Sequence, residues 1–228
     1  MDSVFAHVFE AVRQVVRDNQ AYFNSADVIN HNHGDHMLEI FDLAVQTLHD
    51  LQPGDLAGSM MAAGIAIKKL EGNESARVYS DGLIAFAQKL QQYGIEQAEL
   101  IQFVREKTGE GRLAKRNDDM QPVDETGDHD DRSGQVLKAL VEGLSAWKQM
   151  DSGMSSAGRN LDMGALFELG IIYLQAKQRG GSNIEVLADA AVSASPLNQS
   201  AHRKLSGKIA IQAMLKALAT YESGESIT

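Results

Sequence analysis

The chain has 228 residues, of which 31 are acidic and 21 are Lys or Arg, so its formal net charge is −10. This acidic balance excludes nonspecific binding to nucleic acid, which needs cations to displace counterions. Cysteine is absent, which excludes a disulfide scaffold and a thiolate site.

The N-terminal segment predicts no export and no membrane insertion. It begins with Asp2 and has no basic region before its apolar residues, so it does not look like a signal peptide. No apolar run approaches the roughly 18 residues that a membrane span needs. We therefore expect a cytoplasmic protein without a membrane or nucleic-acid partner.

Apolar residues recur at intervals of three and four along most of the chain, which is typical of amphipathic helices. The first helix is expected from Asp2 or Ser3 to about Phe23, and Ser75 is expected to cap a later one. Residues 108–134 are polar and rich in Gly and Asp, and predict one long loop. The other expected helices are 37–51, 55–70, 75–92, 97–107, 135–150, 162–179, 183–194 and 202–222. This count of about eight or nine predicts a single all-α domain over residues 1–228, arranged as an antiparallel up-and-down bundle.

A dense polar turn at residues 30–36 is the first candidate site, with three histidines, two asparagines and an aspartate around Gly34. Imidazoles favour a transition metal such as Zn or Ni. The alternative is a solvated loop in which Asp35 caps the next helix. The candidate metal ligands here are Asp27, Asn30, His31, Asn32, His33, Asp35 and His36.

Three further segments could carry chemistry. The turn at residues 71–76 precedes a helix and offers free backbone N–H groups to an anion, although Glu74 repels phosphate. The acidic residues between 118 and 131 could hold a cation, but such a run is more often a solvated surface. Residues 177–182 are explained as a basic helix C-terminus with a glycine cap.

Taken in order, these segments resemble the nucleotide-binding L subunit of dihydroxyacetone kinase, the DhaL-like family. The family motif Asp-x-Asp-His-Gly-x-Asn-Met is similar to residues 30–37, where His33, Gly34 and Met37 match. The family's Gly-Gly-Ala-Ser-Gly turn is similar to residues 72–76, and its basic stretch is similar to residues 175–182.

The resemblance implies an antiparallel barrel of about eight helices, with the loops at residues 30, 72, 127 and 180 meeting at one rim. It implies Mg-ATP or Mg-ADP as cofactor and a K-type subunit of dihydroxyacetone kinase as partner; a homo-oligomer stays open. The nucleotide-binding residues that it implies are His33, Gly34, His36, Gly72, Asn73, Ser75, Ala76, Gly127, Asp128 and Arg179.

The chain departs from the family where charge matters most. The family's two clustered metal aspartates fall on Asn30 and Asn32, and its earlier metal aspartate falls near Ser25, with Asp27 close by. Neutral amides hold magnesium poorly, and phosphoryl transfer depends on ions that bridge the phosphates. We therefore expect a divergent relative with weakened or lost phosphotransfer that acts as a binding or regulatory module.

A plain helical interaction protein, which needs none of these sites, stays open, and so do two more specific alternatives. One is an active kinase component with a rearranged metal site, in which Asp27, Asp35 and Asp128 supply the ligands and His33 contacts phosphate. The other is a helical protein that binds a transition metal through His31, His33 and His36.

Overall fold

The computed structural model describes residues 4–51, 55–109, 128–151, 177 and 180–221. Within these ranges every regular element is a helix, which confirms the all-α prediction. None of the described helices is long and apolar enough to cross a bilayer. The α-helices are α1 (Val4–Asp18), α2 (Gln20–Ala26), α3 (His33–Asp50), α4 (Leu56–Ile67), α5 (Glu74–Tyr93), α6 (Gln97–Thr108), α7 (Asp128–Asp151), α9 (Asn183–Ala194) and α10 (Ala201–Thr220), and a short 3-10 helix, η2, spans Pro196–Gln199.

The first predicted helix is divided in two. The break comes at Asn19, whose side-chain Nδ2 donates to the carbonyl of Val15 at 2.8 Å and so competes with the backbone ladder. The change of direction brings Phe23 of α2 fully into the core. Apolar periodicity continues across the break, and for that reason the sequence pattern did not reveal it.

Other boundaries differ from the expectation: α3 begins at His33, inside the predicted turn, and α4 ends at Ile67. Helix α5 is capped by Asn73, whose Oδ1 accepts from the backbone N–H of Ala76 at 3.0 Å, and not by Ser75, which is the second residue of the helix. Helix α7 begins at Asp128, inside the segment predicted as loop, where acidic residues suit the positive end of a helix dipole. The expected helix at 162–179 lies outside the described residues apart from position 177.

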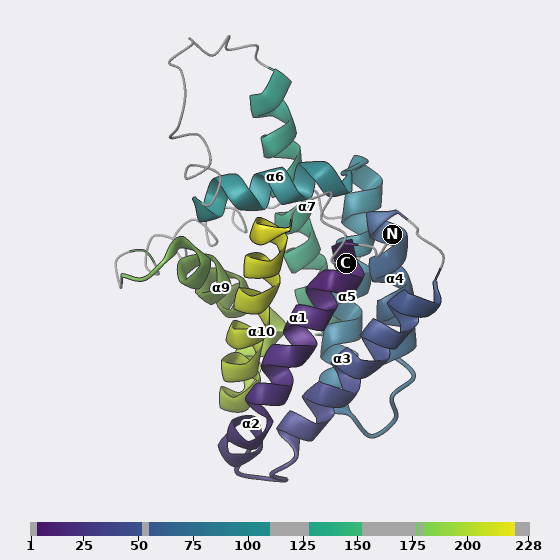
Figure 1. Ribbon diagram of the computed structural model, residues 1–228, viewed down its shortest axis with the longest axis vertical. Helices are drawn as coiled ribbons and strands as arrows, with labels where there is room; N and C mark the ends of the chain where they lie inside the picture. The colour runs from purple at the N-terminus through teal and green to yellow at the C-terminus, as the bar shows by residue number, and fades with distance from the viewer. Residues whose placement is uncertain (1–3, 52–54, 110–127, 152–176, 178–179, 222–228) are drawn as a thin grey trace, which may run out of the picture.

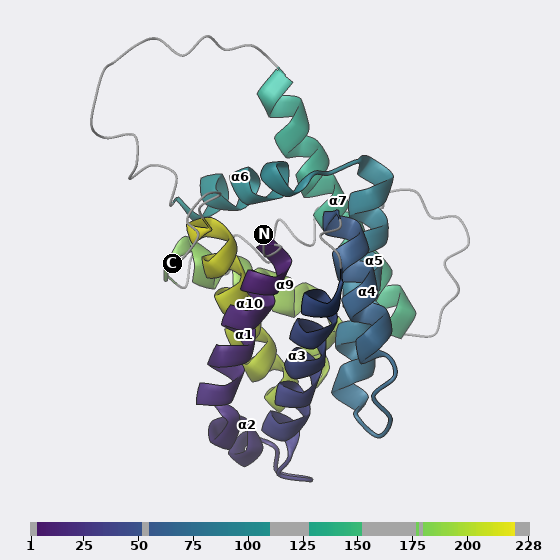
Figure 2. The same ribbon diagram turned by 45° about the vertical axis from the view of Figure 1, so that its right-hand side comes forward.

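The long helices lie side by side in a bundle, and α6 crosses one end of it (Figures 1 and 2). Helix α1 packs between α3 and α10, α4 packs between α3 and α5, and α7 packs on α5. Helix α9 contacts both α7 and α10. The contacts therefore follow a closed order around the bundle, from α1 through α3, α4, α5, α7, α9 and α10 back to α1.

Apolar side chains from these helices form two adjoining cores. The larger core includes Phe9, Phe23, Met37 and Phe41, all essentially without solvent exposure. The smaller core surrounds Trp147 of α7, whose indole ring lies against the backbone of α5 at Gly82. The Trp147 Nε1 also donates to the carbonyl of Val78 at 2.7 Å, so the one polar group of this large buried side chain has a hydrogen-bond partner.

The start of α4 gives a simple test of local sequence signals. Asp55 is the predicted first residue of this segment and is its N-cap, accepting from the backbone N–H of Gly58 at 2.5 Å. We expect Asp55→Ala to lower the free energy of unfolding by about 1 kcal/mol, because it leaves a helix N–H group without its partner. Urea denaturation followed by circular dichroism measures this change. Asp50→Ala, at the exposed end of α3, is the control and should not destabilise the protein.

Candidate functional site

Three helices that are far apart in the sequence begin at the same end of the bundle (Figures 1 and 2). They are α3, α5 and α10, and we call residues 27–36, 72–76 and 200–206 the rim. Each pair of these segments is joined by a hydrogen bond: His33 contacts Ser206, Asn73 contacts the carbonyl of His36, and Arg203 contacts Glu74. The rim therefore unites two of the predicted segments with the start of α10.

His33 is the centre of the rim and is only 2% exposed. Its Nε2 lies 2.8 Å from the Ser206 Oγ, and its Nδ1 lies 3.5 Å from the Ser75 Oγ. The His202 ring packs against it at 4.6 Å between centroids. Burial, with the nearby charges of His202 and Arg203, lowers the pKa of His33 to about 4. The imidazole is therefore neutral at pH 7 and holds α3 to α10.

Asp27 supports the turn that leads into α3. Its Oδ1 accepts from the backbone N–H groups of Ile29 at 3.2 Å and Asn30 at 3.4 Å. Burial raises the pKa of the Asp27 carboxyl, but these backbone hydrogen bonds outweigh it and the pKa is lowered overall. His31 has a φ of 56°, a conformation that non-glycine residues adopt in tight turns. The Asp27 carboxylate therefore holds the backbone that carries the histidines.

The three histidines of this turn do not converge. His31 is exposed, His33 faces the core, and the His36 Nε2 pairs with the Asn32 Nδ2 at 3.3 Å. Across the described ranges, no group of three or more His, Asp or Glu side chains is arranged to hold a metal ion. The ligand set His31, His33 and His36 is therefore not assembled in this structure.

Gly34 and Asp35 join α3 to α2. The Gly34 N–H donates to the Asn24 Oδ1 at 2.6 Å, and the Asp35 Oδ1 accepts from Gln20 at 2.7 Å and Asn24 at 3.0 Å. These side-chain hydrogen bonds lower the pKa of Asp35. The matched glycine of the family motif is therefore explained here by the close packing of two helices.

The second predicted segment also belongs to the rim. Gly72 has a φ of 75°, which favours glycine, and it places Asn73 to bridge two helices. The Asn73 Nδ2 donates to the His36 carbonyl and to the Glu39 carboxylate, both at 3.0 Å. Ser75 and Ala76 are buried behind it, in the first turn of α5.

Of the predicted segments after residue 108, the structure describes residues 128–131, 177 and 180–182, and these lie away from the rim. Gly127 and Arg179 lie outside the described residues. Asp151, at one end of α7, accepts hydrogen bonds from Arg77 and Gln199 near the rim. Asp128, at the other end of this helix, therefore lies at the opposite end of the bundle (Figure 1). The segment after Gly180 begins α9 beside the end of α6, where Asn183 donates to the Thr108 carbonyl. The family resemblance implies that the loops at residues 127 and 180 lie beside those at residues 30 and 72. The described residues that adjoin the first two loops, Asp128 and Gly180, do not lie there.

Sequence reasoning missed the contribution of α10. Ser206 is fully buried against His33, and His202 and Arg203 lie in the first turn of the helix. The Tyr79 hydroxyl, from α5, is buried beside them; burial raises its pKa, and the Ser206 side chain, which hydrogen-bonds it, lowers the pKa only in part. The available signal in the sequence was a cap at Ser200 followed closely by Arg203 and Lys204. Basic residues are unfavourable at a helix N-terminus unless an acidic group compensates their charge.

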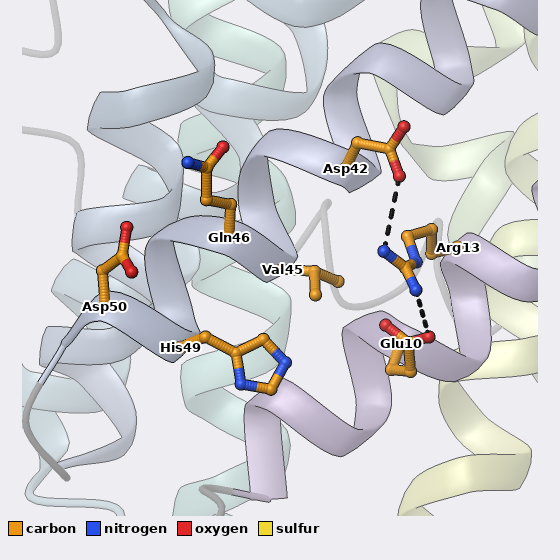
Figure 3. A pocket seen from close by; sticks show the side chains of 7 residues that line it. All are labelled: Glu10, Arg13, Asp42, Val45, Gln46, His49 and Asp50. Atoms are coloured by element: carbon orange, nitrogen blue, oxygen red, sulfur yellow. Dashed lines mark hydrogen bonds and ion pairs between the residues drawn. The ribbon is translucent and has the colours of Figure 1, made fainter.

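One hollow of the described surface lies away from the rim. It is an open pocket of about 530 Å³ between α1 and α3, lined by Glu10, Arg13, Asp42, Val45, Gln46, His49 and Asp50 (Figure 3). The Arg13 guanidinium lies between two carboxylates, 2.5 Å from Glu10 and 3.6 Å from Asp42. The pocket is therefore acidic, and its one arginine is already paired.

Comparison with known proteins gives no match to a family model, a curated protein or a solved structure.

Proposed function

We propose that the protein is a divergent relative of the dihydroxyacetone kinase L subunit that acts as a binding or regulatory module and has lost magnesium-dependent phosphotransfer. The closed order of helix contacts supports the barrel that this family resemblance implies. The meeting of residues 27–36 with residues 72–76 at one end supports the proposed location of the site.

One observation carries the proposal: the two carboxylates in and before the first turn of α3, Asp27 and Asp35, already accept hydrogen bonds that stabilise the fold. Asp27 accepts from the backbone and Asp35 accepts from two side-chain amides. Asn30 and Asn32, at the two positions of the family's metal ligands, carry no charge. A magnesium ion prefers carboxylate oxygens and phosphate, and the only carboxylates of this turn are those of Asp27 and Asp35, whose Oδ1 atoms already accept hydrogen bonds.

The rearranged kinase site gains no support from the geometry. It needs Asp27, Asp35 and Asp128 together, but Asp128 begins a helix of 24 residues whose other end is the one near the rim. A helix of that length spans about 36 Å. A K-type subunit remains the proposed partner of the rim by resemblance alone.

Titration calorimetry with Mg·ADP tests this proposal. We expect no binding at micromolar affinity, because the metal lacks its anionic ligands. Restoring them in the double variant Asn30→Asp/Asn32→Asp should tighten Mg·ADP binding by at least about tenfold. The variant Gln88→Glu/Gln91→Glu adds the same two charges on exposed positions towards the other end of α5 and is the matched control.

Micromolar binding of Mg·ADP by the wild-type protein would contradict the proposal that magnesium-dependent phosphotransfer has been lost. Equal affinities of the restored and control variants would show that residues 30 and 32 do not occupy metal positions.

A further inference from the structure

Arg203 presents an incompletely neutralised charge at the rim. Its side chain is 14% exposed, and its Nη2 donates to the Glu74 carboxylate at 2.9 Å. Its Nε is buried and has no hydrogen-bond partner. Buried guanidinium groups are normally satisfied by anionic or polar acceptors, so this one has an unused donor and a single carboxylate partner.

The surroundings of Arg203 favour an anion. Helices α5 and α10 both begin here, and the positive ends of their dipoles reinforce the arginine. His202 is its neighbour in the first turn of α10, and the buried Tyr79 hydroxyl, which interacts with Ser206, lies near enough to interact with the Arg203 charge. Asp27 faces His202 but is occupied by backbone N–H groups. In the described residues, the rim thus holds one buried N–H donor without a partner, the Arg203 Nε.

Glu74 is a weak partner for this charge. Its side chain is 87% exposed, so solvent screens the ion pair and little holds the carboxylate in place. A glutamate carboxylate also has the shape and charge that a phosphate group would present to a guanidinium. Glu74 therefore stands where the anionic group of a ligand would bind.

We propose that the first turns of α5 and α10 form a metal-independent oxyanion site on the Arg203 guanidinium, which the Glu74 carboxylate closes in the free protein as an intramolecular competitor. The inference rests on the proposed binding function and names its ligand class, a phosphate or phosphate-ester group. Arginine binds such groups through two parallel hydrogen bonds, and the unused Nε–H beside Nη2 supplies that fork once Glu74 moves aside.

The test is a titration of inorganic phosphate in EDTA, followed by NMR or calorimetry on the full chain. Glu74→Gln removes the competing charge, and we expect it to bind phosphate about three- to tenfold more tightly than the wild type. Glu71→Gln is the matched control, because it removes one charge from an exposed position in the same turn without touching Arg203. Arg203→Gln in the Glu74→Gln background should abolish the gain.

Equal affinities of Glu74→Gln and Glu71→Gln would overturn the inference, and this comparison does not depend on the folding of any Arg203 variant. Phosphate binding that appears only when magnesium is added would also overturn it, and would count against the proposed loss of the metal site as well. Failure to bind phosphate in EDTA, together with absent Mg·ADP binding, would remove the oxyanion site and leave the proposed function standing.

Discussion

Gly34→Ala is expected to lower the free energy of unfolding by about 3 kcal/mol, because the new Cβ would overlap the backbone of a neighbouring helix. An ideal Cβ at this position lies 2.2 Å from the Gln20 carbonyl oxygen and 2.8 Å from the Asn24 Oδ1. A backbone carbonyl cannot rotate away as a flexible side chain can. The clash is therefore relieved only by separating α2 from α3, which also breaks the 2.6 Å hydrogen bond from Gly34 to Asn24.

Equilibrium urea denaturation of the wild type and the variant measures this change. Gly134→Ala is the control: it lies within α7, and an added Cβ meets nothing within 4 Å. Alanine is the better helix former, so the control should be more stable than the wild type by about 0.5–1 kcal/mol. If the two alanine variants proved equally stable, the close contact between α2 and α3 would be refuted.

Acidification is expected to destabilise the protein through His33. The pKa of His33 is about 4 in the folded protein, against 6.5 for an ordinary histidine. Because the unfolded chain binds the proton more readily, the contribution of His33 is fully present above pH 6.5 and is lost as the pH falls towards 4. A shift of this size corresponds to a loss of up to about 3 kcal/mol.

The variant His33→Gln isolates this contribution, since glutamine can bond Ser206 but does not titrate. We expect the free energy of unfolding of the wild type to fall more steeply between pH 7 and pH 4 than that of His33→Gln, measured by urea denaturation at each pH. His49→Gln removes an exposed histidine from the same helix and should keep the wild-type slope. Parallel slopes for His33→Gln and the wild type would contradict a buried, neutral His33.

Local signals in the sequence predicted much of the fold. Asp55 begins its helix as an N-cap, and the helix before Pro196 ends at Ala194, because caps and prolines act on their own neighbours. The break at Asn19 was missed because apolar spacing continues through it. The start of α7 was missed because a polar, charged helix end reads like a loop.

The rim shows where prediction from the sequence fails. His33 contacts Ser206, which is 173 positions away, and no local pattern indicates that pairing. The density of histidine in residues 30–36 raised a metal site as one alternative, whereas the structure leaves His31 exposed and buries His33. Glu74 was identified as unfavourable for phosphate, but its partner Arg203 became visible only when α10 was placed beside α5.

The contact between α1 and α10 has a consequence during synthesis on the ribosome. Val8, Phe9, Val12 and Val16 are buried in a core that α10 helps to enclose, yet α10 begins at Ala201. At about 5–20 residues per second, α1 waits on the order of ten to forty seconds for this neighbour to emerge. For that time the apolar face of α1 that packs against α10 in the folded protein has no cover from α10, and the nascent chain is a natural client for chaperones that shield such surfaces.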